Sequence, residues 1–274
     1  GLLIVPAFAQ QNEKPAVIIN LGDSVNTKYD ELAPLITPDG SRIYYGRRNH
    51  PFNTYQRKYG DCVDIFYSKY DSIKGKWRNG RHMPEPFNQR IFNGVESISA
   101  DGKIAYIRGA YKKGHYKGNG ISVAYEDLGK WSDPLRLKIK AFKRLNRGAT
   151  CNFFMASGGK VLLMSFCKIE DGRTIDIFVS FLEDNGNWTK PQELNLPVNT
   201  KQYSEEIPFL ASDNQTLYFS SDRKGGYGKN DLWVTRRSDS SWLNWSEPIV
   251  IDTPINSINW EGYCSIDAIG EYIY

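Results

Sequence analysis

A tryptophan-x-x-proline signature recurs at a fixed interval in this sequence. It occurs at residues 131–134, 188–191 and 245–248, and successive tryptophans are 57 residues apart. A second marker, an apolar residue followed by asparagine, occurs at 25–26, 87–88, 145–146, 198–199 and 255–256. A fixed period of this length, in a chain of short apolar runs and turn residues, predicts a radial array of small β-sheets.

Each repeat divides into four short strands. In the last complete repeat we expect strands at 207–210, 216–219, 231–234 and 249–251, with a hairpin turn at 212–215 whose residues tolerate positive φ. The three earlier repeats show the same order, with strands expected at 35–37, 43–45 and 64–67, at 97–99, 104–107 and 121–125, and at 152–155, 161–165 and 176–179. These runs are apolar or alternating and are bounded by turn residues, which is typical of strands. The sequence predicts no helix.

The two ends of the chain carry incomplete repeats. Residues 15–20 match a fourth strand, whereas residues 260–274 match a first strand, a turn and half of a second. We therefore expect an all-β protein, a β-propeller of four-stranded antiparallel blades. Four blades would be whole and a fifth split or truncated, with five or six blades in all. An N-terminal strand would close the last blade and remove its open edge. The sequence stops inside an expected strand, which predicts further residues beyond Tyr274.

The first nine residues are similar to the end of a secretory signal peptide. Residues 7–9, Ala-Phe-Ala, fit the small-x-small cleavage pattern, which would make Gln10 the mature N-terminus and 10–274 the propeller domain. The alternative is a short buried strand. No other apolar stretch approaches the ~20 residues of a membrane helix, so we expect no membrane span. Cys151 and Cys167 flank a predicted hairpin and are compatible with either a disulfide or two free thiols.

Three segments of the last repeat carry a family resemblance. Residues 205–213, 217–223 and 230–233 read Glu-Glu-Ile-Pro-Phe-Leu-Ala-Ser-Asp, Leu-Tyr-Phe-Ser-Ser-Asp-Arg and Asn-Asp-Leu-Trp. With the three other repeats, they make residues 29–274 resemble the WD40-like (TolB-type, PD40) propeller repeat. The third repeat departs from it with Thr150 in place of glutamate, and the second has Glu96 in place of proline.

The closing stretch, residues 256–274, is similar to propellers of secreted and envelope proteins of gram-negative bacteria. Some of these are joined to an OmpA-like peptidoglycan-binding domain, including the PorE-type component of type IX secretion. The resemblance implies an exported scaffold, periplasmic or associated with the outer membrane. It would bind another envelope protein, with peptidoglycan or an anionic glycan as the second choice. Nucleic acid as a ligand would fit the net charge of +4, but it would not fit an exported protein.

Acidic residues recur with the repeat. Glu31, Glu205 and Glu261 precede first strands, which line the central channel of a propeller, and such carboxylates could bind a metal or a basic segment. A structural role is the preferred interpretation because they repeat with the fold. Asp64 and Asp231 precede third strands, as does Asp176, and here too we prefer a local hydrogen-bonding role to cation binding.

The loops between the second and third strands of the first two repeats are long and basic. The first contains Arg47, Arg48, Arg57 and Lys58, with Tyr55 and Tyr59, and the second contains Arg108, Lys112, Lys113 and Lys117, with Tyr111 and Tyr116. Equivalent loops lie on one face of a propeller, so we expect a basic-aromatic rim. Such a rim suits an acidic protein surface, an anionic glycan or lipid headgroups. The alternative is a pair of solvated loops.

No catalytic, metal or cofactor site is predicted. The sequence lacks a Gly-x-Ser-x-Gly elbow, a Walker motif and a dinucleotide fingerprint, and its three histidines lie in separate loops. The favoured function is a non-catalytic scaffold or recognition module. The alternative is a carbohydrate-active hydrolase, since five-bladed propellers include glycoside hydrolases that use paired carboxylates. Glu96, Asp127 and Glu206 are acids that do not repeat between blades.

Overall fold

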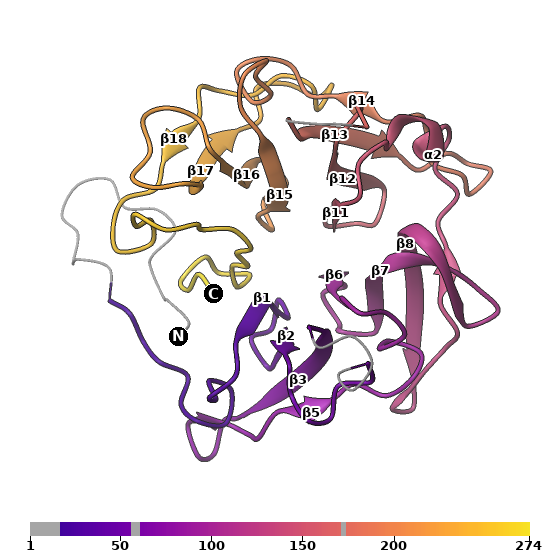
Figure 1. Ribbon diagram of the computed structural model, residues 1–274, viewed down its shortest axis with the longest axis vertical. Helices are drawn as coiled ribbons and strands as arrows, with labels where there is room; N and C mark the ends of the chain where they lie inside the picture. Colours follow the sequence, from indigo (N-terminus) through magenta and orange to yellow (C-terminus); the bar gives the residue numbers. More distant parts are fainter. Residues whose placement is uncertain (1–16, 56–60, 171–173) are drawn as a thin grey trace. The chain divides into compact units, whose positions relative to one another are not determined.

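The computed structural model describes residues 17–55, 61–170 and 174–274, and it shows an all-β propeller built from four antiparallel blades (Figure 1). The chain divides into two compact units. Unit one contains the residues up to Arg136 together with Cys264–Tyr274, and unit two contains Leu137–Tyr263. Each unit holds two blades and its own apolar core.

In both blades of unit one, the outermost position is shared by two short strands. Blade one consists of β1 (Glu31–Ile36), β2 (Arg42–Arg48), β3 (Val63–Asp71), β4 (Lys76–Trp77) and β5 (Arg81–His82). Blade two consists of β6 (Val95–Ile98), β7 (Ile104–Lys112), β8 (His115–Asp127), β9 (Lys130–Trp131) and β10 (Leu135–Arg136). Strands β7 and β8 continue as a long hairpin through the segment that the sequence predicts to be a loop.

Unit two begins with a short helix that the sequence analysis missed, α2 (Phe142–Leu145). Blade three consists of β11 (Cys151–Met155), β12 (Val161–Phe166), β13 (Asp176–Phe181) and β14 (Gln192–Glu193). Blade four consists of β15 (Glu205–Leu210), β16 (Thr216–Ser221), β17 (Asp231–Arg236) and β18 (Ile249–Val250). All the strands predicted for these two blades are present, most of them one or two residues longer.

The repeated asparagine has a clear physical role. In blade three, Asn199 accepts a hydrogen bond from the Ile177 backbone N–H at 2.8 Å and donates to the Ile177 carbonyl at 2.8 Å and the Leu194 carbonyl at 3.0 Å. Asn88 binds Ile65 in the same way. Asn256 and Leu232 repeat the contact in blade four. In blades one, three and four the side chain therefore ties the end of the blade to the start of its third strand, which explains why these three copies of the marker follow the repeat.

Three predictions about the ends and the cysteines need comment. Four complete blades lie within the described residues, fewer than the five or six predicted, and residues 260–274 add only two isolated bridges, Asn230 to Trp260 and Ile266 to Ile273. Of the predicted closing strand, residues 15–16 lie outside the described residues, as does the predicted signal segment 1–9. Residues 17–20 form no extended strand pairing, and their apolar side chains are exposed. Cys151 and Cys167 are buried free thiols, so the disulfide alternative is wrong.

No helix within the described ranges has the length and apolar character required to cross a membrane.

Candidate functional site

The three repeated glutamates each hold the turn that leads into a first strand. Each carboxylate accepts two hydrogen bonds, one from the backbone N–H and one from the hydroxyl of a Thr or Ser four or five residues earlier. The donors are Thr27 for Glu31, Thr200 for Glu205 and Ser257 for Glu261. Each carboxylate is therefore already bonded by its own chain, which supports the structural interpretation.

Two of these glutamates also bind a buried arginine. Arg47 Nε lies 2.9 Å from Glu31 Oε1, and its Nη2 donates to the Val25 carbonyl at 3.0 Å. The Arg47 side chain is only 5% exposed. Its guanidinium also lies 4.7 Å from the centre of the Phe66 ring. Arg47, predicted to belong to the exposed rim, thus lies inside blade one because Glu31 and an aromatic ring hold it there.

Blade four fills the same place with a guanidinium from a different backbone position. Arg223 Nη2 lies 3.0 Å from Glu205 Oε1, and it also donates to the Val198 carbonyl. Its guanidinium lies 4.9 Å from the Phe219 ring centre and 5.3 Å from that of Trp233. Arg223 follows the strand, whereas Arg47 is within β2, so the likeness between the two blades is visible only in three dimensions.

Burial raises the pKa of Glu205 to about 7, although hydrogen bonds from Thr200 and the Arg223 charge act in the opposite direction. Partial burial also raises the pKa of the neighbouring Glu206, and a hydrogen bond from Asn230 opposes this rise. Glu205 itself has no solvent-exposed surface. It therefore cannot touch a substrate, despite a pKa in the range of a general acid.

We predict that Glu205→Gln flattens the pH dependence of stability. The ordinary glutamate pKa is 4.5 and the folded value is about 7. The folded chain therefore binds the proton more tightly, and this stabilisation is complete below pH 4.5 and is lost as pH rises through 7. Between pH 5 and pH 8 the free energy of unfolding should fall by about 2 kcal/mol less in the variant than in the wild type. Urea unfolding at the two pH values measures this difference. An identical pH dependence in both proteins would contradict the prediction.

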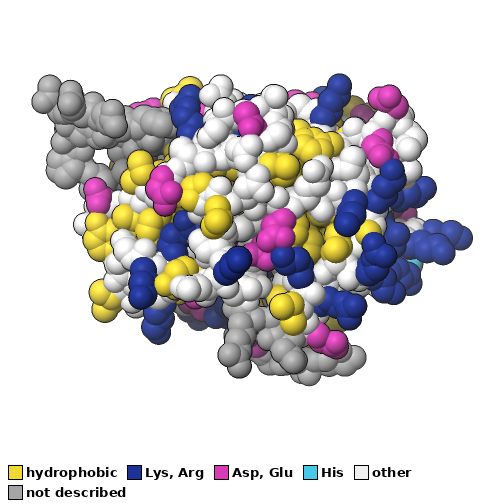
Figure 2. Space-filling model, turned by 90° about the horizontal axis from the view of Figure 1, so that it is seen from above, with side chains coloured by type: hydrophobic (Ala, Val, Ile, Leu, Met, Phe, Trp, Pro, Cys, Tyr) yellow, Lys and Arg dark blue, Asp and Glu magenta, His cyan; other side chains and the backbone are white. Residues whose placement is uncertain are grey.

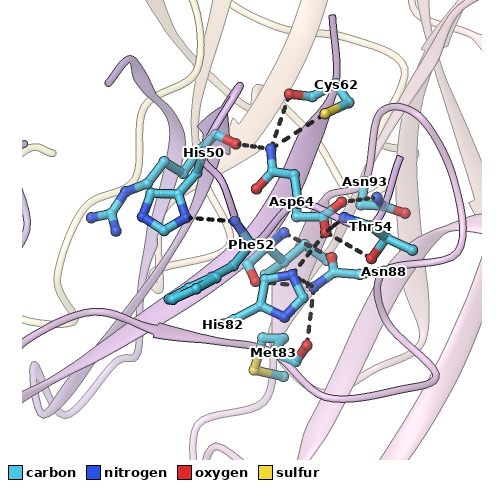
Figure 3. Close-up of polar contacts among 12 residues, drawn as sticks. His50, Phe52, Thr54, Cys62, Asp64, His82, Met83, Asn88 and Asn93 are labelled. Atoms are coloured by element: carbon cyan, nitrogen blue, oxygen red, sulfur yellow. Dashed lines mark hydrogen bonds and ion pairs between the residues drawn. The ribbon is translucent and has the colours of Figure 1, made fainter. Parts of the chain in front are cut away.

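Asp64 organises the surface loop of blade one (Figure 3). Its buried carboxylate accepts hydrogen bonds from the Thr54 N–H at 2.7 Å and the Thr54 hydroxyl at 2.9 Å. It also accepts from the Asn93 amide at 3.0 Å and lies 2.7 Å from His82 Nε2. Asp231 performs the same task in blade four, where two backbone N–H groups of the preceding loop bind it. The local hydrogen-bonding role expected for these aspartates fits this geometry.

His82 is paired with Asp64, but no hydrogen bond joins its ring to a hydroxyl or thiol of any described residue. His82 Nε2 lies 2.7 Å from Asp64 Oδ2 and 3.1 Å from Asn88 Nδ2. The His82 side chain is 29% exposed. The nearby Cys62 is fully buried, and burial raises the pKa of its thiol, so it is a poor nucleophile. No group of three or more metal-ligating side chains occurs among the described residues.

An aromatic ledge lies beside this network. Phe52 is 73% exposed, and its ring packs edge-on against His50 with centroids 5.1 Å apart. His50 Nδ1 accepts the Phe52 backbone N–H at 3.2 Å, and burial lowers the pKa of His50. Tyr29 contacts the same imidazole at 4.9 Å. The ledge presents the exposed Phe52 ring in a fixed orientation. The sequence-based prediction of the rim included only basic residues and tyrosines, and Phe52 was not among them.

Gln89 joins the two loops of the predicted rim. Tyr55 donates its hydroxyl proton to the Gln89 carbonyl at 3.2 Å. The Gln89 side chain donates to the Gly114 carbonyl at 2.7 Å and accepts the Tyr116 N–H at 3.2 Å. Arg90 lies 4.5 Å from the Tyr116 ring centre. The structure therefore places the two loops side by side within unit one.

The predicted rim residues divide into exposed and bonded groups. Lys112, Lys113 and Lys117 are exposed at the end of the β7–β8 hairpin. Arg108 instead binds Glu96 and is mostly buried. Arg48 is 41% exposed and lies 3.7 Å from Asp30 and Asp61, and Tyr111 is buried. Arg57 and Lys58 lie outside the described residues. Tyr111 packs against the Tyr116 ring, and Arg108 binds the Glu96 carboxylate. These contacts favour a structural role for both residues.

Asn93 is a repeat position that the sequence comparison missed. It accepts the Arg90 backbone N–H at 2.9 Å, as the repeated glutamates accept that of their Thr or Ser. Its amide then donates to Asp64, which a glutamate at the same place would repel. Glu96, which the sequence analysis compared with proline positions, lies three residues later. The spacing of Asn93 from the Phe87–Asn88 marker is the signal that would have identified it.

Comparisons with known proteins were made for the sequence and for the fold. No protein-family model matches the sequence, and no curated protein matches it. Solved structures with the same fold include TolB from Acinetobacter baumannii, with 13% identity, a TM-score of 0.47 and coverage of 91% of this chain and 55% of that one. They also include a thermostable family-43 glycoside hydrolase, with 13% identity, a TM-score of 0.51 and coverage of 91% and 83%. A putative TolB from Agrobacterium tumefaciens has 12% identity, a TM-score of 0.48 and coverage of 90% of both chains.

The chain spans about half the length of the Acinetobacter TolB that it matches. At these identities the likeness concerns the fold alone, which does not determine function. The comparisons therefore establish a β-propeller, and its function must be argued from its residues.

Proposed function

We propose that this protein is a non-catalytic recognition module of the bacterial envelope, which binds an acidic protein partner. The binding surface, called the hairpin surface below, consists of Lys112, Lys113 and Lys117 with Arg90 and Phe52. We propose the location in the envelope from the signal-like residues 1–9 and from the family resemblance. An anionic glycan such as peptidoglycan is the second choice of ligand.

The observation that carries the proposal is the contrast between bonded acids and unbonded lysines. Glu31 and Glu205 are bonded by the chain's own arginines and hydroxyl groups. By contrast, Lys112, Lys113 and Lys117 are exposed and form no ion pair with any described residue. Free cations on a surface attract an acidic partner and accelerate its association.

The hairpin is also held rigidly. Gln89 fixes its tip through Gly114 and Tyr116, and Tyr116 packs edge-on against Tyr111 at 5.9 Å. A rigid hairpin loses little conformational entropy when it binds, so more of the interaction energy appears as affinity. The exposed Phe52 ring adds an aromatic anchor of the kind enriched in protein interfaces.

A peptide-display selection on the immobilised protein tests this function. We expect recovered peptides to be enriched in Asp and Glu, and to bind Lys112→Glu/Lys113→Glu/Lys117→Glu at least about tenfold more weakly than wild type. The matched control, Lys74→Glu/Lys76→Glu/Lys103→Glu, makes the same charge change at exposed positions elsewhere in unit one and should retain binding. Selection of neutral peptides, or equal loss in both variants, would contradict the proposal.

Glu206 supports a second candidate, hydrolysis of a glycan. It lies on a first strand, is partly exposed, and burial raises its pKa, as a general acid requires. One oxygen accepts the Asn230 amide at 3.1 Å. The candidate is weaker because the adjacent Glu205 is buried and bonded to Arg223, so it cannot serve as the partner carboxylate.

A further inference from the structure

A second basic surface lies on unit two, in the segment Lys138–Arg147. It contains Lys138, Lys140, Lys143, Arg144 and Arg147, and it contains no acid. All five side chains are exposed. Since the whole chain has a net charge of +4, the rest of the sequence is net negative without this segment. Figure 2 shows Lys and Arg side chains gathered on one part of the surface.

The segment is anchored to blade three along its length. Ile139 forms a parallel bridge with Trp188, whose N–H donates to the Lys138 carbonyl at 2.9 Å. The buried Phe142 ring lies 5.6 Å from both Phe153 and Phe166. The Arg147 N–H donates to the Cys167 carbonyl at 2.9 Å. The backbone that carries the five cations is therefore fixed before any partner binds, and only their side chains remain to be ordered.

Most of these cations have no counter-charge within the described parts of the chain. Lys140 Nζ lies 2.6 Å from Glu183 Oε1. Lys138, Lys143, Arg144 and Arg147 form no ion pair there. Repulsion among four unpaired cations on one short segment disfavours the unbound state, and an acidic ligand would relieve it.

The segment indicates which acidic ligand fits. Its one aromatic ring, Phe142, is buried, so it offers no platform for stacking bases or sugar rings. Its apolar side chains Ile139 and Leu145 are at most half-exposed, so it lacks an apolar face that would enter a bilayer. The segment can therefore recognise a ligand only through charge. A peptide with several Asp or Glu residues carries such negative charges one after another, as carboxylates.

The spacing of the first two cations matches such a peptide. Lys138 and Lys140 flank Ile139, which bridges Trp188, so their Cα atoms lie roughly 7 Å apart. An extended peptide repeats its side chains on one face at the same interval. We propose that this α2 surface, Lys138, Lys140, Lys143, Arg144 and Arg147, binds an extended acidic peptide segment with carboxylates two residues apart. It shares no residue with the hairpin surface of unit one.

Fluorescence anisotropy with a labelled decaglutamate peptide tests the proposal on the whole chain. We expect saturable binding in 50 mM salt that weakens strongly at 300 mM salt. Lys143→Glu/Arg144→Glu/Arg147→Glu should weaken it at least about tenfold, because three attractive charges become repulsive. The comparison is made in the Lys112→Glu/Lys113→Glu/Lys117→Glu background, so that the hairpin surface does not bind the peptide. Lys74→Glu/Lys76→Glu/Lys103→Glu, added to that background, is the matched control and should leave binding within about twofold.

Each other outcome overturns the proposal. Absence of peptide binding, or equal loss in both triple variants, would show that the α2 surface is no specific site. Stronger binding to vesicles of anionic lipid or to single-stranded DNA than to the peptide would assign the cations to a different ligand. Because Phe142 and the backbone anchors are unchanged, circular dichroism should confirm that the variant is folded. A negative result in this test would not contradict the function proposed for the hairpin surface, because that function is tested with different residues.

Discussion

Replacing Arg223 with alanine should lower the free energy of unfolding by about 3–5 kcal/mol. The arginine neutralises Glu205, which has no exposed surface, and it donates to the Val198 and Pro197 carbonyls. Its removal leaves a buried carboxylate without a counter-charge and two carbonyls without a donor. Urea unfolding of the purified variant at pH 8, where Glu205 is ionised, measures the effect.

Two further variants separate the ion pair from general damage. Arg236→Ala removes an exposed arginine from the same blade and should change stability by less than about 0.5 kcal/mol. The double variant Glu205→Leu/Arg223→Met removes both charges and should regain much of the lost stability, because no buried charge remains unpaired. If Arg223→Ala were as stable as wild type, the buried pair would have no role in holding blade four together.

Asn199→Ala should cost about 2–4 kcal/mol of unfolding free energy. The substitution leaves the N–H of Ile177 and the carbonyl of Leu194 without their partner in the core of unit two, whereas the Ile177 carbonyl keeps the Leu194 N–H. Buried backbone groups that lose a hydrogen bond pay their full desolvation cost. Thermal or urea unfolding measures the change.

Asn195→Ala provides the matched control for this prediction. Asn195 is exposed and its side chain binds Asn244, so its loss should cost less than about 0.5 kcal/mol. Asn199→Asp should be nearly as harmful as the alanine variant, because a carboxylate would face two carbonyl oxygens without a proton to donate. A small loss in both Asn199 variants would mean that the repeated asparagine is not the clamp that the geometry indicates.

The strands of blades three and four could be predicted from the sequence because their determinants are local. Residues 216–219 and 231–234 are short apolar runs between turn residues, and the apolar-Asn marker recurs after these two blades because Asn199 and Asn256 each bind the third strand of their own blade. The same regularity located Glu205 and Asp231 at strand entries. Such features depend on contacts within one repeat, and a periodic sequence displays them directly.

Features that depend on contacts between repeats could not be predicted. Arg47 appears in a run of basic loop residues, and only the facing Glu31 and Phe66 reveal that it is buried. Arg223 fills the same place from another backbone position. Asn93 replaces a repeated glutamate because its amide donates a hydrogen bond to Asp64 of the preceding blade. The α2 segment was missed because its helix is only four residues long and is held by Phe142 rather than by helix propensity.

The most direct test of recognition without catalysis is a search for turnover. Wild-type protein and Glu206→Gln should be incubated with arabinan, xylan and peptidoglycan, and the soluble products analysed by mass spectrometry. The account predicts that neither protein releases products above a buffer control. Products released by the wild type and absent with Glu206→Gln would contradict it and would assign the protein to the glycan hydrolases.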